Sequence, residues 1–445
     1  MQGKRWNMNP NGYGSLRRVG LQCFLAAALV ACGGGGDSGP SGTAPTISNL
    51  QYSPQAAYAS ASSAMFTGQL AFSDPDGDLS SATLTIVNSG GATVSTSAIP
   101  IQGAAGATSG VIQGSVVASL TVADNYTLQV FVTDARGLRS NTLSGPVRIA
   151  QFPWTSKLAS STARENAAAV AINDRIYVVG GARTDAGFYR GPVTGVVEAY
   201  DPKTNTWAAM PSMPTARALL VAAVVNGKLY AIGGAAEGGT TVGTVEEFDP
   251  GTEVWTARAP MPTPRYSAAG AQVGGRILVA GGSGSGFLST SVSEIYDPAT
   301  NSWSTAGSLP SERTELAGAE SGGRMYAIGG NEGLTAALLP WYFPYRNVDA
   351  YDPTTNAWTS RSAMPTARWE LTVVAVDGKL LAIGGADRRG GFDVLESFDV
   401  AANAWSTKTP SPRVLIGKPA AVVDGKVYVF GDGLTLEYDP ANEIR

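Results

Sequence analysis

Short apolar runs that alternate with polar and glycine-containing turns make up most of this 445-residue chain. In one clear stretch, the apolar run 218–225 is followed by the turn Asn226-Gly227 and by a second apolar run that ends at Gly233-Gly234. Runs of this length, bounded by Asn-Gly, Asp-Gly or Gly-Gly turns, are typical of β-strands joined as hairpins. The pattern therefore predicts an all-β protein.

The same unit of four short strands returns along the C-terminal two thirds of the chain. Each copy has an Arg, two apolar runs, a Gly-Gly pair, an acidic residue three places before an Asp, and in five copies a Trp six residues after that Asp. A unit that cannot bury its own apolar face stacks on copies of itself, and four-stranded sheets arranged around an axis form a β-propeller. The Gly-Gly pairs begin at Gly180, Gly233, Gly281, Gly329 and Gly384, with a degenerate sixth copy at Gly431.

The two ends of this repetitive region are incomplete in a complementary way. Trp154 precedes Arg164 by the same interval that separates each later Trp from the next Arg, and the last copy ends without a Trp. Residues 152–164 therefore supply a fourth strand to the three strands predicted over 413–439. The prediction is a six-bladed propeller over residues 151–445, closed without a covalent bond.

These motifs resemble kelch repeats over about residues 152–445. The Gly-Gly pair with the spaced aromatic residue and Trp is a specific signal, and Met-Pro-x-x-Arg junctions at Met213, Met261 and Met364 add to it. The resemblance implies a six-bladed kelch propeller. We interpret the repeated Gly and Trp as structural, and we expect the repeated Arg to pair with acids such as Glu198, Glu246, Glu294 and Glu396. The repeated Arg are Arg164, Arg217, Arg265, Arg313, Arg368 and Arg413.

The N-terminus predicts export and a lipid anchor. Residues 1–31 are basic at first and then apolar, as in a signal peptide, and the sequence Leu29-Val30-Ala31-Cys32 resembles a bacterial lipoprotein box. The resemblance implies cleavage before Cys32, lipid attachment to its thiol, and a location in the bacterial cell envelope. Gly33 after Cys32 makes the outer membrane the favoured site by analogy. The alternative is an ordinary secretory signal with an incidental Cys. Residues 32–44 read as a flexible tether.

Residues 45–150 alternate apolar and small polar residues in short runs, which predicts an immunoglobulin-like β-sandwich. The turn Asp74-Pro75-Asp76-Gly77-Asp78 looks like those of bacterial cadherin-like or immunoglobulin-like modules. Asp74, Asp76 and Asp78 could share a Ca²⁺ ion. The Gly is fourth rather than sixth, however, and Thr85 stands where a calcium loop would need Glu. A plain polar turn is therefore preferred, with Ca²⁺ as the weaker alternative.

The amino-acid composition argues against several classes of function. The chain has no His, which excludes Ser-His-Asp catalysis, His-ligated metals and a copper radical site like that of galactose oxidases. Acidic residues number 35 against 31 basic ones, and four of the basic residues lie within 1–31, where there is no acid. The remainder is therefore clearly negative, which argues against nucleic acid as a partner.

Strand direction predicts where a site lies. The loops after the Gly-Gly pairs and the Arg-bearing junctions between blades emerge on one face, because direction reverses with each strand. Those loops vary most in length, and variable loops on a rigid scaffold carry function. Residues 341–345 could instead fold back and pack on the propeller. The predicted ligand-binding residues on this face are Arg183, Tyr189, Arg190, Tyr266, Trp341, Tyr342, Phe343, Tyr345, Arg346, Trp369, Arg388 and Arg389.

These observations predict a non-catalytic lipoprotein of the cell envelope whose propeller loop face recognises a protein, peptide or glycan. The alternative is a carbohydrate-processing enzyme that resembles the six-bladed kelch sialic acid mutarotases. In that interpretation Glu315 or Glu370 would move a proton and Arg313 or Arg368 would hold an acidic sugar. Neither hypothesis requires a cofactor.

Overall fold

The computed structural model describes residues 42–59, 64–102, 105–183, 192–333 and 343–444, together with the backbone of 29–31. The chain divides into two compact units, residues 1–151 and 152–443, and each is described by itself below. Among the described residues, none of the helices has the length and apolar character needed to cross a membrane.

The N-terminal unit consists of two β-sheets. The first has the strand order β1 (Leu29–Ala31), β7 (Ser109–Ala118), β4 (Ala64–Ser73) and β2 (Thr46–Ser53). The second has the order β3 (Ala56–Tyr58), β9 (Leu143–Ala150), β8 (Asp124–Asp134), β5 (Leu79–Val87) and β6 (Thr93–Pro100). All neighbouring strands are antiparallel except β3 and β9. β1 lies within the segment that the sequence predicts to be a signal peptide.

The core of this unit lies between its two sheets. β8 buries every second residue, so that Val130 and Val132 point to the same side. They pack in one apolar cluster with Leu70, Phe72 and Ile112 from the opposite sheet. Alternating burial on two facing sheets defines a β-sandwich. Its closer likeness to immunoglobulin domains remains a prediction.

The acidic turns of the sandwich are braced by hydrogen bonds. Asp74 is fully buried and one of its carboxylate oxygens accepts from the backbone N–H of Asp78 at 2.9 Å. Asp134 accepts from the N–H groups of Arg136 and Leu138 in the adjacent loop, and the Arg136 side chain pairs with Asp76 at 3.3 Å. The described residues contain no group of three or more His, Cys, Asp or Glu able to hold a metal ion. The Ca²⁺ alternative stays a prediction.

The repeat unit contains six four-stranded antiparallel sheets. The first three have β11 (Ala168–Ile172), β12 (Arg175–Val179), β13 (Val197–Asp201) and β14 (Thr206–Met210); β15 (Val221–Val225), β16 (Lys228–Ile232), β19 (Val245–Asp249) and β20 (Val254–Arg258); and β21 (Ala269–Val273), β22 (Arg276–Ala280), β23 (Ser293–Asp297) and β24 (Ser302–Thr305).

The last three sheets follow the same plan. They have β25 (Ala317–Ser321), β26 (Arg324–Ile328), β27 (Val348–Asp352) and β28 (Ala357–Ser360); β29 (Thr372–Val376), β30 (Lys379–Ile383), β33 (Leu395–Asp399) and β34 (Ala404–Thr407); and β35 (Ala420–Val423), β36 (Lys426–Gly431), β37 (Leu434–Tyr438) and β10 (Trp154–Ser156). Two short hairpins, β17 (Ala235–Ala236) with β18 (Thr240–Thr241) and β31 (Ala386–Asp387) with β32 (Gly390–Gly391), lie in the connecting loops.

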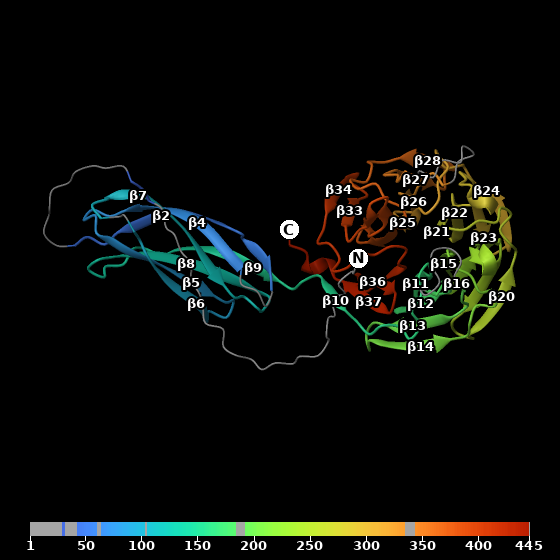
Figure 1. Ribbon diagram of the computed structural model, residues 1–445, viewed down its shortest axis with the longest axis horizontal. Coiled ribbons are helices and arrows are strands. Elements are labelled where there is room, and N and C mark those ends of the chain that lie inside the picture. Colours follow the sequence, from blue (N-terminus) through green and yellow to red (C-terminus); the bar gives the residue numbers. More distant parts are fainter. Residues whose placement is uncertain are drawn as a thin grey trace, which may run out of the picture. The chain divides into compact units, whose positions relative to one another are not determined.

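The six sheets form a ring. The first strand of each sheet contacts the first strand of the next, and β35 contacts β11 to close the circle. Figure 1 shows these strands around a common axis, with β14, β20, β24, β28 and β34 at the rim. The last sheet is completed by β10, whose Trp154 lies opposite Tyr438 of β37. The spacing of Trp154 and Arg164 in the sequence pointed to this pairing.

The Gly-Gly pairs allow consecutive sheets to touch through their backbones. Gly233 and Gly234 have φ angles of 60° and 106°, and the N–H of Gly234 donates to the carbonyl of Arg265 at 3.0 Å. A Cβ on Gly233 would lie 2.6 Å from that same carbonyl oxygen. Only Gly satisfies both the left-handed backbone and the close approach.

Each repeated Arg in the first five sheets is buried in an ion pair. Arg217 has no exposed surface; it donates to Glu246 at 2.5 Å, and to the carbonyls of Thr215, Ala231 and Gly233 at 2.8 to 2.9 Å. The structure thus confirms the pairing expected for the repeated Arg and acids. The corresponding pairs in the other four sheets are Arg164 with Glu198, Arg265 with Glu294, Arg313 with Asp349, and Arg368 with Glu396.

The sixth sheet lacks this pair, which corrects one expectation. The N–H of Gly385 donates to the carbonyl of Leu415 at 2.7 Å, the bond that Gly234 makes to Arg265. Leu415 therefore occupies the Arg position, and Arg413 is an exposed residue two places earlier. The sequence pattern misassigned Arg413 because Leu415 replaces the Arg at the regular interval of ten residues after Trp405, and Arg413 lies two residues short of that position.

Each Trp connects its own sheet to the outer strand of the preceding sheet. The indole N–H of Trp255 donates to the carbonyl of Pro211 at 2.9 Å, and its ring packs on Phe248 with centroids 5.0 Å apart. The interpretation of the Trp side chains as spacers between sheets is therefore correct. Equivalent indole bonds are made by Trp154, Trp207, Trp303, Trp358 and Trp405.

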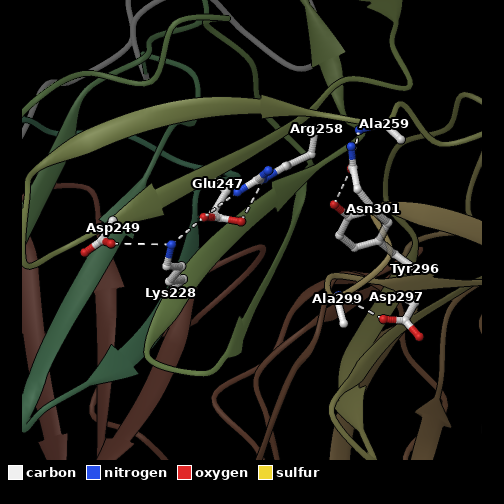
Figure 2. Close-up of polar contacts among 9 residues, drawn as sticks. All are labelled: Lys228, Glu247, Asp249, Arg258, Ala259, Tyr296, Asp297, Ala299 and Asn301. Carbon is white, nitrogen blue, oxygen red and sulfur yellow. Dashed lines mark hydrogen bonds and ion pairs between the residues drawn. The ribbon is translucent and has the colours of Figure 1, made fainter.

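An Asn that the sequence pattern did not single out reinforces the same contact. In the turn after β23, the Asn301 side chain accepts from the Tyr296 hydroxyl at 2.7 Å and from the N–H of Ala259 in the preceding sheet at 2.8 Å (Figure 2). Asn301 has a φ of 51°, which Asn tolerates better than most residues. Figure 2 also shows Asp297 accepting from Ala299 to shape the turn.

Candidate functional site

A ring of backbone hydrogen bonds surrounds the axis of the repeat unit. It is made by the residue two places after each Arg position, which is Leu415 in the sixth sheet, and each member has a φ between 49° and 59°. Five N–H to carbonyl bonds of 2.9 to 3.0 Å join successive members from Asn166 round to Gly417, for example from Glu370 to Glu315 and from Gly417 to Glu370. We call this set the axial ring: Asn166, Leu219, Ser267, Glu315, Glu370 and Gly417.

The unusual backbone of the axial ring belongs to the scaffold, since the ring has it whether the side chain is Leu, Ser or Glu. Side chains on the ring are therefore free to differ. Two adjacent members are Glu315 and Glu370, so two acidic residues follow each other on the ring.

A cavity with a volume of about 420 Å³ is lined by both of these residues. Its wall combines three aromatic rings with three carboxylates. These residues are Tyr266, Phe287, Trp369, Glu315, Glu370 and Asp387.

Two kinds of segment supply this wall. Tyr266, Glu315 and Trp369 come from the junctions between sheets, whereas Phe287 and Asp387 come from the loops after the Gly-Gly pairs. Short backbone bridges tie the two kinds together, as in the pair Trp369 and Ala386, whose N–H groups and carbonyls bond at 2.9 and 3.0 Å. Loops and junctions thus meet on one face, as strand direction predicts.

Glu315 is positioned by a buried amide. The side-chain NH₂ of Asn331 donates to a Glu315 carboxylate oxygen at 2.5 Å, and its carbonyl oxygen accepts from the N–H of Gly333 at 2.7 Å. Asn331 is fully buried, so its orientation is fixed by the scaffold. Sequence reasoning missed Asn331, which directly follows Gly329-Gly330, and Phe287 in the loop after Gly281-Gly282, although their place in these loops could have pointed to them.

Two smaller cavities, of about 140 and 270 Å³, adjoin the first and share Glu370 with it. One basic side chain, Lys418, lines both, and it pairs with Asp432. Burial raises the pKa of Glu165 in this region; Lys418 opposes the shift and Asp432 adds to it. Among the described residues that line these three cavities, acidic side chains outnumber basic ones.

Four predicted site residues line the 420 Å³ cavity: Tyr266 and Trp369 from the ligand-binding set, and Glu315 and Glu370 from the enzyme alternative. Sequence reasoning found them because they follow the repeated Arg and differ between copies.

The other described residues of the ligand-binding set do not line this cavity. Phe343 is 53% exposed and the guanidinium of Arg388 lies 4.0 Å from the centre of its ring. Tyr345 has a raised pKa because it is partly buried. Arg183, Arg346 and Arg389 are exposed. Tyr189, Arg190, Trp341 and Tyr342, as well as the lipidation residue Cys32, lie outside the described residues.

The enzyme alternative needed Arg313 or Arg368 to hold an acidic sugar, and this part of the prediction is wrong. Both side chains are fully buried and paired with Asp349 and Glu396, respectively. Burial lowers the pKa of each guanidinium while the partner carboxylate opposes the shift. These side chains are parts of the scaffold and are not available to a ligand.

Comparison with known proteins agrees with this architecture. A kelch-repeats domain model described as KLHDC2/KLHL20/DRC7 matches residues 166–363, and the Kelch motif matches residues 370–412. The chain therefore contains a kelch-repeat domain with the architecture of a β-propeller.

Several curated proteins are similar over short stretches. Kelch-like protein 33 of Homo sapiens is 33% identical over 103 residues, which are 23% of this chain and 18% of that protein. Kelch-like protein 40 of Xenopus laevis is 36% identical over 86 residues, 19% of this chain and 13% of that protein. An F-box/kelch-repeat protein of Arabidopsis thaliana is 36% identical over 81 residues, 18% of this chain and 20% of that protein. The chain thus matches a fifth or less of each relative's length.

One solved structure, titled "Structure of YjhT", superimposes on the chain with a TM-score of 0.52 and 15% sequence identity. The superposition covers 63% of this chain and 95% of that one. At this level of identity the likeness concerns the fold alone.

Proposed function

We propose that this protein is a non-catalytic binding lipoprotein of the bacterial cell envelope. A closed six-bladed propeller would bind a glycan in the cavity beside Glu315 and Glu370. The observation that carries the proposal is the wall of that cavity, which combines aromatic rings with carboxylates.

The chemistry of a sugar suits such a wall. A pyranose ring has an apolar face that packs on aromatic side chains such as Trp369 and Tyr266, whose large surfaces dominate binding energies. Its hydroxyl groups donate hydrogen bonds, and a hydrogen bond to a carboxylate is stronger than one to a neutral acceptor. Glu315, Glu370 and Asp387 offer such acceptors within the same cavity.

The form of the site favours a compact ligand over a broad protein partner. A volume of about 420 Å³ falls within the range of about 300 to 1,000 Å³ that is usual for small-molecule sites. Protein interfaces are flatter and bury about 800 Å² on each partner. One or a few sugar units, or the end of a glycan chain, match this concave site better than a folded partner does.

The N-terminal sequence supports the location. The apolar run before Cys32 and the small-residue segment 33–44 suit a lipid anchor followed by a tether. The sandwich would then act as a spacer between the tether and the propeller.

For the carbohydrate-processing alternative, the two predicted carboxylates line the cavity, but the two predicted Arg side chains do not. Glu315 and Glu370 line a concave cavity, as a general acid or base requires. Arg313 and Arg368, which would have held an acidic substrate, are buried in ion pairs. Binding without catalysis is therefore the better-supported function.

A glycan array probed with the wild-type chain and with Trp369→Ala tests the proposal. We expect wild type to bind a set of glycans and Trp369→Ala to lose at least about tenfold in affinity, because truncation of a central aromatic residue typically costs 2 kcal/mol or more. Phe343→Ala is the matched control, since Phe343 is an exposed aromatic residue outside the cavity. Loss of binding in Phe343→Ala alone would place the site on the outer loops.

The same glycans can be used to examine catalysis. NMR exchange between the α and β anomers of a bound reducing sugar should be as slow with the protein as in buffer. Acceleration by wild type that disappears in Glu370→Gln would instead establish the enzyme alternative.

A further inference from the structure

A cavity of about 60 Å³ lies between the two sheets of the N-terminal sandwich. One water-sized group needs about 10 to 15 Å³, so this space has room for about four to six such groups. We call it the sandwich cavity. Its apolar wall includes Phe66, Leu70 and Ile112 from one sheet and Ile99, Leu128 and Val130 from the other.

Two glycines stand opposite each other in the wall of the sandwich cavity. Gly68 of β4 is the partner of Gly114 on β7. Successive residues of a strand point to opposite faces of a sheet. Both glycines fall on the inward face, in alternation with buried residues such as Phe66 on β4 and Ile112 on β7. The sheet thus lacks a side chain at two neighbouring positions where the alternation calls for an apolar residue.

Glycine inside a strand weakens it, and such a residue often marks a bulge or a place where another backbone or a ligand comes close. At Gly68 a backbone is close, because a Cβ there would lie 2.7 Å from the carbonyl oxygen of Gln51. Gly114 has no such neighbour among the described residues, since a Cβ there would meet no atom within 4 Å.

The backbone at Gly114 gives no other reason for glycine. Its φ angle is not positive, and the pairing of β4 with β7 runs without a bulge. A side chain at this position would therefore fit without strain. Of the usual reasons for a glycine inside a strand, the approach of a ligand is the one that suits Gly114.

Polar groups next to the sandwich cavity are bonded to one another. On the outer face of the same sheet, Gln69 donates to Gln51 at 2.8 Å and Gln113 donates to Gln69 at 3.0 Å. The hydroxyl of Tyr52, whose ring lines the cavity, donates to the carbonyl of Pro146 at 2.6 Å. A ligand between the sheets therefore meets mainly carbon, and a polar group buried there would lose its hydrogen bonds to water without replacement.

We propose that the sandwich cavity binds a small neutral hydrocarbon group of about four to six carbon atoms, such as a single aromatic ring. The volume sets the size of the ligand and the apolar wall sets its chemistry. A ligand of this kind supplies the dispersion contacts that the atoms around a hollow otherwise lack. The site belongs to the N-terminal unit, so it is independent of the glycan binding proposed for the propeller.

Benzene and phenol test the proposal by NMR of the full chain with labelled Ile methyl groups. Ile99, Ile101 and Ile112 line the cavity, whereas Ile232 and Ile328 are buried in the repeat unit. We expect benzene to shift the signals of the first three residues, with a Kd of about 1 mM or tighter for its six apolar atoms. Phenol should bind at least about tenfold more weakly, because its hydroxyl group would be buried without a partner.

Variants at Gly114 locate the effect. Gly114→Val places three carbon atoms in the cavity and should weaken benzene binding at least about tenfold. Gly114→Ala adds a single carbon that meets no other described atom, so it should fold like wild type and bind several-fold more weakly. Val111→Ile is the matched control, because Val111 is 37% exposed on the other face of β7 and does not line the cavity. It should bind benzene as wild type does.

Each outcome decides the proposal. Benzene shifts at Ile99, Ile101 and Ile112 that weaken in both Gly114 variants support it. Equal binding by wild type and both variants, shifts in the repeat unit alone, or no shift at all would overturn it. Phenol binding as tight as that of benzene would overturn the neutral hydrocarbon as the class of ligand. None of these results changes the outcome of the glycan array, which examines the cavity of the propeller.

Discussion

Five sheets of the repeat unit are built around a buried ion pair, and the sixth is built around two leucines. In the third sheet, Arg265 is 1% exposed and donates to Glu294 at 2.5 Å. In the sixth sheet, Leu415 takes the Arg position and Leu436 takes the acidic position. Both Leu side chains are 2% exposed and belong to one apolar cluster.

The comparison shows that the fold does not require charges at these two positions. It requires compatible side chains, either an Arg with an acid or two apolar residues. Removing two charges from water is costly, and their attraction offsets this cost only with good geometry and additional hydrogen bonds. Arg265 has these bonds, since it also donates to the carbonyls of Thr263 and Val279 at 2.9 and 3.0 Å. A pair of apolar residues avoids the cost altogether. A mixed pair would have neither advantage.

The sixth sheet differs in another respect that bears on the same point. Its fourth strand, β10, is separated in sequence from the other three and is joined to them only by pairing with β37. Trp154 of β10 and Leu415 belong to one apolar cluster, so the closure of the ring is surrounded by apolar side chains. Apolar contacts at this point need no exact alignment of donors and acceptors.

The largest effect is expected from breaking one ion pair. Glu294→Leu leaves Arg265 charged and buried without its carboxylate, which should reduce the free energy of unfolding by about 3 to 5 kcal/mol. Guanidinium denaturation followed by Trp fluorescence measures this, because residues 42–151 contain no Trp and the signal follows the repeat unit. A loss below about 1 kcal/mol would mean that the pair is not needed.

The second prediction concerns a double variant whose third sheet has Leu at the Arg position and at the acidic position, as the sixth sheet has. Arg265→Leu combined with Glu294→Leu removes both charges, so the double variant should recover at least about 2 kcal/mol of the stability lost in Glu294→Leu. Full recovery is not expected, because the carbonyls of Thr263 and Val279 lose their donor. A double variant as unstable as Glu294→Leu would show that the sixth sheet depends on more than its two leucines.

The third prediction concerns acid stability. Burial alone would raise the pKa of Glu247, but hydrogen bonds from Arg258 and Lys228 (Figure 2), together with one from Tyr230, outweigh it and lower the pKa from 4.5 to about 2. A carboxylate whose pKa is lowered by folding stabilises the protein above pH 4.5, and this contribution disappears as the pH falls towards 2.

In Glu247→Gln, the unfolding free energy should therefore lack this part of its dependence on pH. Its unfolding free energy, measured by Trp fluorescence at several acidic pH values, should change less than that of wild type between pH 4.5 and 2. Glu253→Gln is the control, as Glu253 is an exposed acid in the next turn of the same sheet. Identical slopes for Glu247→Gln and wild type would contradict the prediction.

The smallest effect is expected from Lys228, the more exposed basic partner of Glu247. Lys228 pairs with Glu247 at 2.9 Å, but its side chain is 37% exposed. Exposed ion pairs contribute about 0 to 1 kcal/mol, so Lys228→Ala should alter the unfolding free energy by no more than this. The same denaturation experiment checks it. A loss as large as that of Glu294→Leu would remove the distinction between buried and exposed pairs.

The sequence was informative wherever a residue has the same role in every copy. Spacing alone pointed to the Gly-Gly contacts, the Trp spacers and the Arg–acid pairs, because each depends on bonds within one sheet or between neighbours. It failed at Arg413, because Leu415 stands at the regular position and the nearby Arg lies two residues before it. It also missed Asn331, because the role of that residue depends on the Glu315 side chain of a neighbouring segment.

The sequence by itself determined the strands, their grouping in fours and the face on which loops and junctions meet, since turns, alternation and strand direction are local properties. Tertiary structure alone decided which side chains share a cavity. Tyr266 and Phe287 belong to the third repeat and Trp369 and Asp387 to the fifth, and the two pairs meet only because the sheets are arranged around a common axis. It also decided that Arg313 and Arg368 face the scaffold, because burial depends on neighbours that no single repeat contains.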